Sequence, residues 1–477
     1  MSRKPFPPAA LFLGGKKSRS RIAIPALFLC MSIGVQAGHV TATLFVDPHA
    51  TGPSHDGSTW CHAFLTLQDA LAAATLNTII MVAEGVYRPD RGGGQSSGNR
   101  SATFHLQTGV ALLGGFAGCG EINPNAHDVV LHETVLSGDL SGDDGPGFSN
   151  YDENSYHVVN GSFVNGSAFL DGFTITGGNA DGPDPDLRGG GLLINAGSPT
   201  IRHCTFRENK ATLGGAMNYE GASPMVTDSI FVGNSAGFAG GAMRGWDSSP
   251  FVQNCLFVGN TAEAGGAAWY GASIPRFANC TFFANSADQG NALSFDSCCP
   301  QQPSTLLATN CIFWDGGDEF WNEDGSTLNV TQSDVQSGWE GQGNIDDDPL
   351  FVPGPGGCFY LSQTAAGQEV TSPCVDGGGD QAADLDMDVL TSRSDEAGDT
   401  GTVDMGYHFP ITGRALMMGD LDRSLRIDLF DIAGFQRCFT GDEPTGVSPC
   451  CRIFDFAMDA DVDLDDLFEF YLAITGP

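Results

Sequence analysis

The stretch GGAMNYEGASPMVTDSIFVGNSAGFAGGAMRGWDSSPFVQNCLFVGN, residues 214–260, contains nearly the same unit twice. The glycine pair that opens this unit recurs at steps of 25, 26 and 25 residues, and a weaker copy follows after 25 more. A period of roughly 20–50 residues is typical of stacked repeats, in which one unit cannot bury its own apolar face. The sequence therefore predicts a solenoid. Its copies begin at Gly189, Gly214, Gly240, Gly265 and Gly290.

Inside each unit, an apolar residue is followed by two polar residues, a cysteine or serine, a variable residue and phenylalanine. This order favours two short strands joined by a tight bend over an amphipathic helix. Asn or Asp at the bend tolerates the left-handed backbone that a sharp corner requires. With three strands per coil, the predicted fold is a parallel β-helix. Its expected bend column is His203, Asp228, Asn254 and Asn279, and its expected buried column is Phe206, Phe231, Phe257 and Phe282.

The copies GGAM and GGAA, with their endings FREN, FVGN and FFAN, resemble the repeats of polymorphic outer-membrane proteins. More broadly, they resemble right-handed parallel β-helix proteins of the pectin-lyase type. The repeats extend over about residues 155–335. The resemblance implies an all-β, right-handed parallel β-helix. The segments on either side of the repeats also look like the ends of secreted bacterial β-helix proteins.

Residues 1–37 are predicted to be a secretion signal of the Sec type. Arg19 and Arg21 precede the apolar run 22–35, and a small-residue pattern ends at Ala37. We therefore expect a secreted or cell-surface protein without a transmembrane segment. The expected domains are the signal (1–37), an N-terminal cap with the first coils (38–130), the β-helix repeats (131–352), a C-terminal cap with acidic loops (353–412) and a separate module (413–477).

The chain is strongly acidic. Its formal net charge is −36, and it becomes −42 when the six basic residues of the signal are removed. Such a surface repels nucleic acids and anionic membranes, and it attracts divalent cations. We expect a monomer that does not bind nucleic acid.

We expect two kinds of cysteine in this chain: buried core residues and disulfide partners. Cys204, Cys255 and Cys280 fall in the inward column of the coils, where they are expected to be small core residues. Export permits disulfides elsewhere in the chain. The candidate pairs are Cys358 with Cys374, and Cys438 with Cys450 or Cys451.

The tail contains two acidic loops, 35 residues apart, and an amphipathic stretch follows each loop. The duplication resembles type I dockerin modules, and it implies calcium as a cofactor and a cohesin-like partner. Oxygen ligands at alternating positions suit a hard cation. Leu425 and Ala460 replace the glycine that such loops favour at position 6, and Ala457 lacks a ligand oxygen. A calcium-free reading of the same acids as helix caps therefore stays open. The candidate ligands are Asp420, Asp422, Ser424, Asp428 and Asp431 in the first loop, and Asp455, Asp459, Asp463 and Asp466 in the second.

One outer wall of the solenoid is predicted to bind a glycan. Trp246, Trp269 and Arg244 fall at outward positions of successive coils. Aromatic rings with nearby polar groups suit the stacking and hydrogen bonding of sugars, and we expect both tryptophans to be partly exposed. Alternatively, the insertion at residues 179–188 covers them. The remaining candidate residues of this wall are Asn218, Glu220 and Asp247.

A catalytic site is not apparent in the repeats. A lyase would need a base beside clustered carboxylates, and a glycosidase would need a pair of carboxylates. The basic residues fall in different columns, and we expect no acidic column beside them. The preferred hypothesis is therefore a rigid scaffold that binds a polysaccharide or a partner surface, and the alternative is a polysaccharide lyase or glycoside hydrolase on the same fold. The basic residues considered are Arg202, Arg207, Lys210, Arg244 and Arg276.

Overall fold

The computed structural model describes residues 40–296 and 302–413, together with Cys438, Cys451–Phe454, Val462 and Asp466. The predicted signal and eight of the nine candidate calcium ligands lie outside the described residues. All strands lie within residues 41–477, the larger of two compact units. None of the helices in the described ranges has the length and apolar character needed to span a bilayer.

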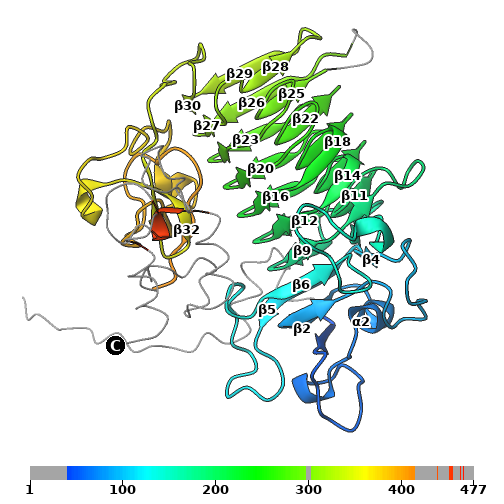
Figure 1. The fold of residues 1–477 in the computed structure, drawn as a ribbon. Helices are drawn as coiled ribbons and strands as arrows, with labels where there is room; N and C mark the ends of the chain where they lie inside the picture. The colour runs from blue at the N-terminus through cyan, green and yellow to red at the C-terminus, as the bar shows by residue number, and fades with distance from the viewer. Residues whose placement is uncertain are drawn as a thin grey trace, which may run out of the picture. The chain divides into compact units, whose positions relative to one another are not determined.

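The fold is a parallel β-helix in which three sheets stack coil upon coil (Figure 1). Sheet 1 consists of β1 (Ala42–Val46), β2 (Thr78–Ala83), β5 (Val110–Phe116), β8 (Phe169–Asp171), β12 (Thr200–Arg202), β16 (Met225–Thr227), β20 (Phe251–Gln253), β23 (Arg276–Ala278), β26 (Thr305–Thr309) and β29 (Thr327–Thr331). Sheet 2 consists of β3 (Gly85–Tyr87), β6 (Thr134–Ser137), β9 (Thr174–Thr176), β13 (Thr205–Arg207), β17 (Ile230–Val232), β21 (Leu256–Val258), β24 (Thr281–Phe283), β27 (Ile312–Trp314) and β30 (Asp334–Val335). Sheet 3 consists of β4 (Phe104–His105), β7 (Val159–Asn160), β11 (Leu192–Asn195), β15 (Met217–Glu220), β19 (Met243–Trp246), β22 (Ala268–Gly271), β25 (Leu293–Phe295) and β28 (Phe320–Asn322).

Smaller elements lie between and beyond these sheets. A small parallel sheet joins three segments that connect sheet 2 to sheet 3: β10 (Asn179–Ala180), β14 (Lys210–Leu213) and β18 (Ser235–Ala239). Near the N-terminus, α2 (Leu67–Ala73) begins at Thr66, whose hydroxyl accepts a hydrogen bond from the Asp69 N–H. Two antiparallel pairs follow the coils: β31 (Phe351–Gly354) with β32 (Gly357–Leu361), and β33 (Leu390–Thr391) with β34 (Phe409–Pro410). Short 3₁₀ turns are η1 (Trp60–His62), η2 (Tyr151–Glu153), η3 (Thr364–Ala366), η4 (Ala382–Asp384) and η5 (Cys451–Phe454).

The predicted phenylalanine column is confirmed. Phe206, Phe231, Phe257 and Phe282 pair in register in sheet 2, and each is fully buried. Their rings stack with successive centroid distances of 5.0, 4.8 and 4.7 Å. These spacings match the separation of neighbouring strands, so the repeat places one ring on the next.

The bend column is also confirmed. His203, Asp228, Asn254 and Asn279 have φ values of 48°, 51°, 50° and 51°. A second column of asparagines closes each repeat inside the coil, and each side-chain amide donates a hydrogen bond to the amide oxygen of the next coil. This asparagine ladder consists of Asn209, Asn234, Asn260 and Asn285, and its last amide donates to Asp315 Oδ1 at 2.9 Å.

Residues 351–413, which we call the cap segment, pack on the outer side of sheet 2. Tyr360, Met405 and Phe409 form one buried cluster with Leu256 and Ile312 of the coils. Asn254 also accepts a hydrogen bond from the His408 N–H and donates one to the His408 carbonyl. The bend column therefore anchors a segment that lies about 150 residues further along the chain.

The disulfide predictions are partly wrong. Cys358 and Cys374 are buried and do not form a disulfide with each other, and Cys374 Sγ lies 3.2 Å from Asp334 Oδ2. In the tail, Cys438 pairs with Cys451. Cys204, Cys255 and Cys280 are buried and unpaired, as expected for small core residues.

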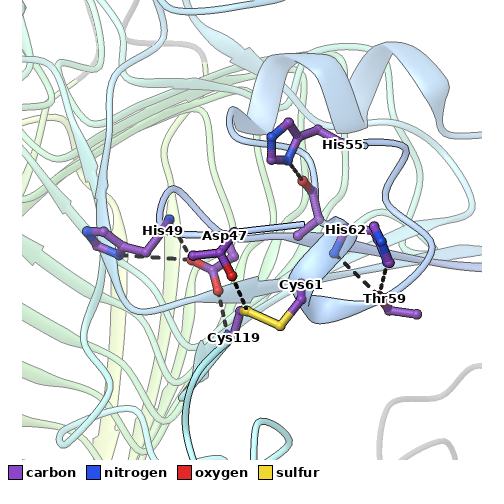
Figure 2. Close-up of a disulfide and its surroundings, with 9 residues drawn as sticks. Asp47, His49, His55, Thr59, Cys61, His62 and Cys119 are labelled. Atoms are coloured by element: carbon purple, nitrogen blue, oxygen red, sulfur yellow. Dashed lines mark hydrogen bonds and ion pairs between the residues drawn. A yellow bond between two sulfur atoms is a disulfide. The ribbon is translucent and has the colours of Figure 1, made fainter. Parts of the chain in front are cut away.

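A further disulfide, Cys61–Cys119, was not predicted (Figure 2). It joins two loops near the N-terminus. The buried carboxylate of Asp47 supports it by accepting the N–H groups of His49 and Cys119. This bond fastens the end of the solenoid where coil stacking begins.

Candidate functional site

The outward face of sheet 3 has the columns that the sequence predicts. In the first column, Arg244 lies between Asn218 and Trp269 on neighbouring strands. In the second, Trp246 lies between Glu220 and Gly271. Five of the six candidate wall residues therefore lie on the adjacent strands β15, β19 and β22, and the sixth, Asp247, is exposed directly after β19.

The two predicted tryptophans form a stack. Their ring centroids are 6.0 Å apart, with an angle of 10° between the ring planes. Gly271 leaves space for this arrangement, because a Cβ there would lie 2.5 Å from the Trp246 ring. Trp246 is partly exposed, whereas Trp269 is 7 % exposed and packs against Ala239 and Ala264. The expected exposure is therefore wrong for Trp269, because the connecting segments cover its outer side.

Arg244 contacts three other residues of the wall. Its guanidinium donates to Asn218 Oδ1 at 2.9 Å and to Glu220 Oε1 at 2.8 Å, and it lies 5.2 Å from the Trp269 ring centroid. Burial lowers the pKa of Arg244, and the Glu220 carboxylate opposes this effect. Glu220 also pairs with Arg188 of the insertion. The insertion at residues 179–188 thus contacts the wall at Glu220. Trp246 remains partly exposed to solvent.

The wall continues one step further than the sequence analysis proposed. Trp321 of β28 lies next to Ser294, which lies next to Trp269, in the same outward column. Trp321 is half-buried. The loop around residues 297–304 breaks the 25-residue period, so the period does not point to this tryptophan. The wall therefore carries two partly exposed rings, Trp246 and Trp321, on either side of a buried one.

A second polar site lies at the corner between sheets 1 and 2. We call it the corner pocket, and it encloses about 140 Å³. The bends contribute His203, Asp228 and Asn254 to its lining, and the cap segment contributes Leu390, Phe409 and Thr412. The sequence did not reveal it, because eight of its nineteen lining residues come from the distant cap segment.

The corner pocket contains an oriented imidazole. His203 Nδ1 lies 2.9 Å from Asp171 Oδ1, and its Nε2 lies 4.0 Å from Asp228 Oδ2. Asp171 also accepts hydrogen bonds from Arg202 at 2.7 and 3.1 Å. Burial raises the pKa of Asp171, but the hydrogen bonds from His203 and Arg202 outweigh burial, so this pKa lies below its ordinary value.

Three of the five basic residues considered nevertheless have an acidic partner each, and these partners lie at different places in the coils. Arg202 pairs with Asp171, and Arg244 pairs with Glu220. A third pair joins Arg207 to Glu133, an acid that precedes the clear repeats. The repeat pattern does not predict these ion pairs, because two of the three join a regular coil to a neighbouring coil whose sequence is less regular.

Comparisons with known proteins agree with the fold. The family model described as "Right handed beta helix region" matches residues 158–335. With the three parallel sheets, this match supports a right-handed β-helix fold for the coils. The resemblance to the repeats of polymorphic outer-membrane proteins stays a prediction.

Solved structures with pectin-lyase-like folds are also similar. They include pectin methylesterase PemA from Erwinia chrysanthemi, with 11% identity, a TM-score of 0.34, and coverage of 65% of this chain and 92% of that chain. Another is pectate lyase Pel9A, with 14% identity, a TM-score of 0.33, and coverage of 77% and 97%. These likenesses identify no activity for this chain. No curated protein sequence matches it.

Proposed function

We propose that this chain is a secreted or cell-surface scaffold that binds polysaccharide on the outward face of sheet 3. The observation that carries the proposal is the Trp246–Trp269 stack, which holds a partly exposed indole on a rigid sheet. Trp321 supplies a second ring on the same face. Rings fixed in this way lose little conformational entropy when a ligand stacks on them.

The polar groups beside the rings support a glycan over an apolar partner. Asp247 is exposed next to Trp246, and Asn195 is partly exposed on β11. Arg244 and Glu220 already bind each other, so they orient the wall more than they offer free groups. An amphipathic surface with apolar rings and hydrogen-bonding edges is suited to sugars, which have both kinds of surface.

A retention assay tests this proposal. The mature chain is applied to immobilised neutral and acidic polysaccharides, and the double variant Trp246→Ala/Trp321→Ala is compared with it. We expect at least a tenfold loss of affinity in the double variant. The matched control is Phe238→Ala, which removes an exposed aromatic ring from β18, outside the wall. Retention that is equal in both variants and the wild type would contradict the proposal.

A specific observation favours a second candidate, a polysaccharide lyase or glycoside hydrolase. In the corner pocket, Asp171 orients His203 so that Nε2 faces the Asp228 side. An imidazole held by a carboxylate is an arrangement that general acid–base catalysis uses. Incubation with the same polysaccharides, scored for new reducing ends and unsaturated products, tests it. Product from the wild type and none from His203→Asn would favour the enzyme, since asparagine fits the bend.

The tail completes the proposed function. We propose that residues 413–477 bind calcium and dock onto a cohesin-like partner, as the resemblance to dockerins implies. Of the nine candidate ligands, Asp466 is described, and it is helical and fully buried. The Cys438–Cys451 disulfide lies between the two predicted loops and joins their flanks.

A further inference from the structure

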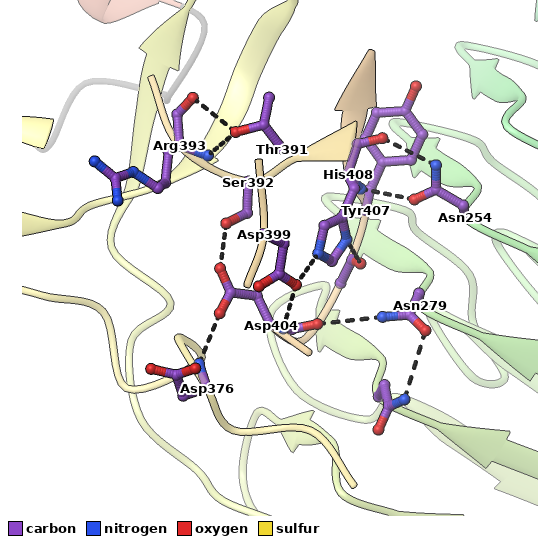
Figure 3. A network of polar contacts seen from close by, with 12 residues as sticks. Asn254, Asn279, Asp376, Thr391, Ser392, Arg393, Asp399, Asp404, Tyr407 and His408 are labelled. Carbon is purple, nitrogen blue, oxygen red and sulfur yellow. Dashed lines mark hydrogen bonds and ion pairs between the residues drawn. The ribbon is translucent and has the colours of Figure 1, made fainter. Parts of the chain in front are cut away.

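Two carboxylates and an imidazole are buried together in the cap segment (Figure 3). Asp399 is 5 % exposed, Asp404 is 3 % exposed and His408 is fully buried. One carboxylate oxygen of each aspartate and one ring nitrogen of His408 all lie within 4.8 Å of one another. The wall does not use these groups, and of the three only His408 also lines the corner pocket.

The contacts around His408 fix its orientation. Its Nδ1 lies 3.0 Å from the Gly406 carbonyl, which accepts hydrogen bonds and donates none, so Nδ1 carries a proton. Its Nε2 consequently faces the carboxylates and lies 3.0 Å from Asp399 Oδ2. Histidines that bind a metal through one ring nitrogen typically donate the N–H of the other nitrogen to a carbonyl or carboxylate, as His408 does to Gly406.

The aspartates are held just as firmly. Asp399 Oδ2 accepts the Asp404 N–H at 3.0 Å, and Asp404 Oδ1 accepts the Asp376 N–H at 2.7 Å. Asp404 Oδ2 contacts the Ser392 hydroxyl and the Gln363 amide. The three ligand-type groups are therefore preorganised by backbone and side-chain contacts, and a hydroxyl lies beside them.

The charges of this cluster do not balance. Within residues 40–296 and 302–413, neither aspartate forms an ion pair with arginine or lysine, and His408, which lies beside Asp399, carries a positive charge only when it is protonated. Even a protonated His408 leaves one buried negative charge if both carboxylates are ionised. An unpaired buried charge is costly. A divalent cation would neutralise both carboxylates and accept the lone pair of a neutral imidazole.

We propose that Asp399, Asp404 and His408 form a structural zinc site. One imidazole nitrogen with two carboxylate oxygens suits Zn²⁺, whereas Ca²⁺ prefers oxygen ligands alone. All three groups are buried, and the Ser392 hydroxyl beside Asp404 Oδ2, or a water, would supply the fourth ligand that a tetrahedral zinc site requires. Its role would be to fasten the cap segment where Asn254 and Asn279 hold the backbone of His408 and Asp404.

Metal analysis of the full mature chain, purified without chelator and with calcium in excess, tests the proposal. We expect about one equivalent of zinc per chain. A strong zinc chelator should lower Tm by several degrees, and Zn²⁺ but not Ca²⁺ should restore it. Replacement by Co²⁺ should give the visible absorption of a tetrahedral site.

Asp404→Asn is the test variant, since it keeps the size of the side chain and removes one charged ligand. The matched control is Asp376→Asn, because the backbone of Asp376 contacts the cluster while its carboxyl group is not part of the triad. Zinc should be lost in the first variant and kept in the second. If the first variant fails to fold, the wild-type chelation and cobalt measurements decide. The proposal would be overturned if the wild type contained no stoichiometric zinc and its Tm did not change with the chelator. The three groups would then form only a hydrogen-bonded cluster.

Discussion

The Asn254 side chain forms two hydrogen bonds with the backbone of His408, at 2.9 Å to its carbonyl and 2.7 Å from its N–H. Asn254 is thus both a bend residue with a φ of 50° and the receptor for a distant segment. Asn279 donates one hydrogen bond to the Asp404 carbonyl, and Asn310 accepts one from the Gly379 N–H, so two further corner residues contact the cap segment. The corners of the coils therefore hold the cap segment against the solenoid.

We expect Asn254→Asp to destabilise the protein by about 1–3 kcal/mol, because the buried His408 carbonyl loses its donor and faces an oxygen. Aspartate keeps the tolerance for the left-handed backbone, so the loss reports on the side-chain contacts, which include the hydrogen bond that Asn254 donates to Asp228 Oδ1 at 3.0 Å. Denaturant unfolding measures it. The control is Asn99→Asp, at an exposed site where the side chain accepts a hydrogen bond from Ser101. Equal stability of the two variants would contradict the anchoring role.

Phe257→Ala should cost about 3–5 kcal/mol, because it removes a fully buried ring from the middle of a stack. Its neighbours Phe231 and Phe282 are held by their own strands and cannot close the gap. Urea unfolding of this variant and of Phe238→Ala, which truncates an exposed ring, makes the comparison. A loss below about 1 kcal/mol in Phe257→Ala would contradict the tight packing of the column.

Asp334 should make stability depend on pH. Burial raises the pKa of Asp334 to about 7, and the hydrogen bond from the Cys374 thiol opposes this rise. Because the folded pKa lies above the unfolded one, the associated stability is present below about pH 4 and is lost as the pH rises through about 7. Asp334→Asn should therefore match the wild type at pH 4 and exceed it at pH 8, by up to about 4 kcal/mol.

The measurement for Asp334 is the free energy of unfolding at both pH values. Asp347→Asn, at a neighbouring exposed site, serves as the control and should change little. If the advantage of Asp334→Asn is the same at pH 4 and pH 8, the carboxyl group is not the source of the pH dependence.

Calcium titration of the mature chain, followed by calorimetry and circular dichroism, should show heat of binding with a gain of helix. Gathering these acids without a cation sets like charges against each other, so the metal should order the tail. Asp420→Ala with Asp431→Ala should abolish binding to the first loop. Asp386→Ala, in an exposed acidic stretch of the cap segment, should leave the heat unchanged. A tail that is fully helical in chelator and binds no calcium would favour the helix-cap interpretation.

The coils could be predicted because their determinants are local and periodic. A 25-residue step places Phe231 beside Phe257, and the bend requires a residue such as Asn254. The same periodicity correctly placed Arg244 and Trp246 on the outward face.

The burial of Trp269 could not be predicted in this way. It depends on Ala239 and Ala264, which belong to connecting segments that the repeat pattern does not orient. The corner pocket is lined by both His203 and Phe409, which are far apart in the sequence. Long-range packing places them side by side, and the repeat pattern does not report it. The Cys61–Cys119 bond lies outside the period altogether.

The asparagine ladder ends at Asp315, and this end affects where additional coils could be inserted into the solenoid. Each amide both donates and accepts, so a copied coil inserted between Asn209 and Asn285 would continue the chain of hydrogen bonds. Asp315 Oδ1 accepts hydrogen bonds from both the backbone N–H and the side-chain amide of Asn285, but Asp315 has no amide group with which to continue the ladder. A duplicated 25-residue segment inserted before Asp315 would therefore extend the ladder, whereas the coil after Asp315 stacks through the strands β28, β29 and β30.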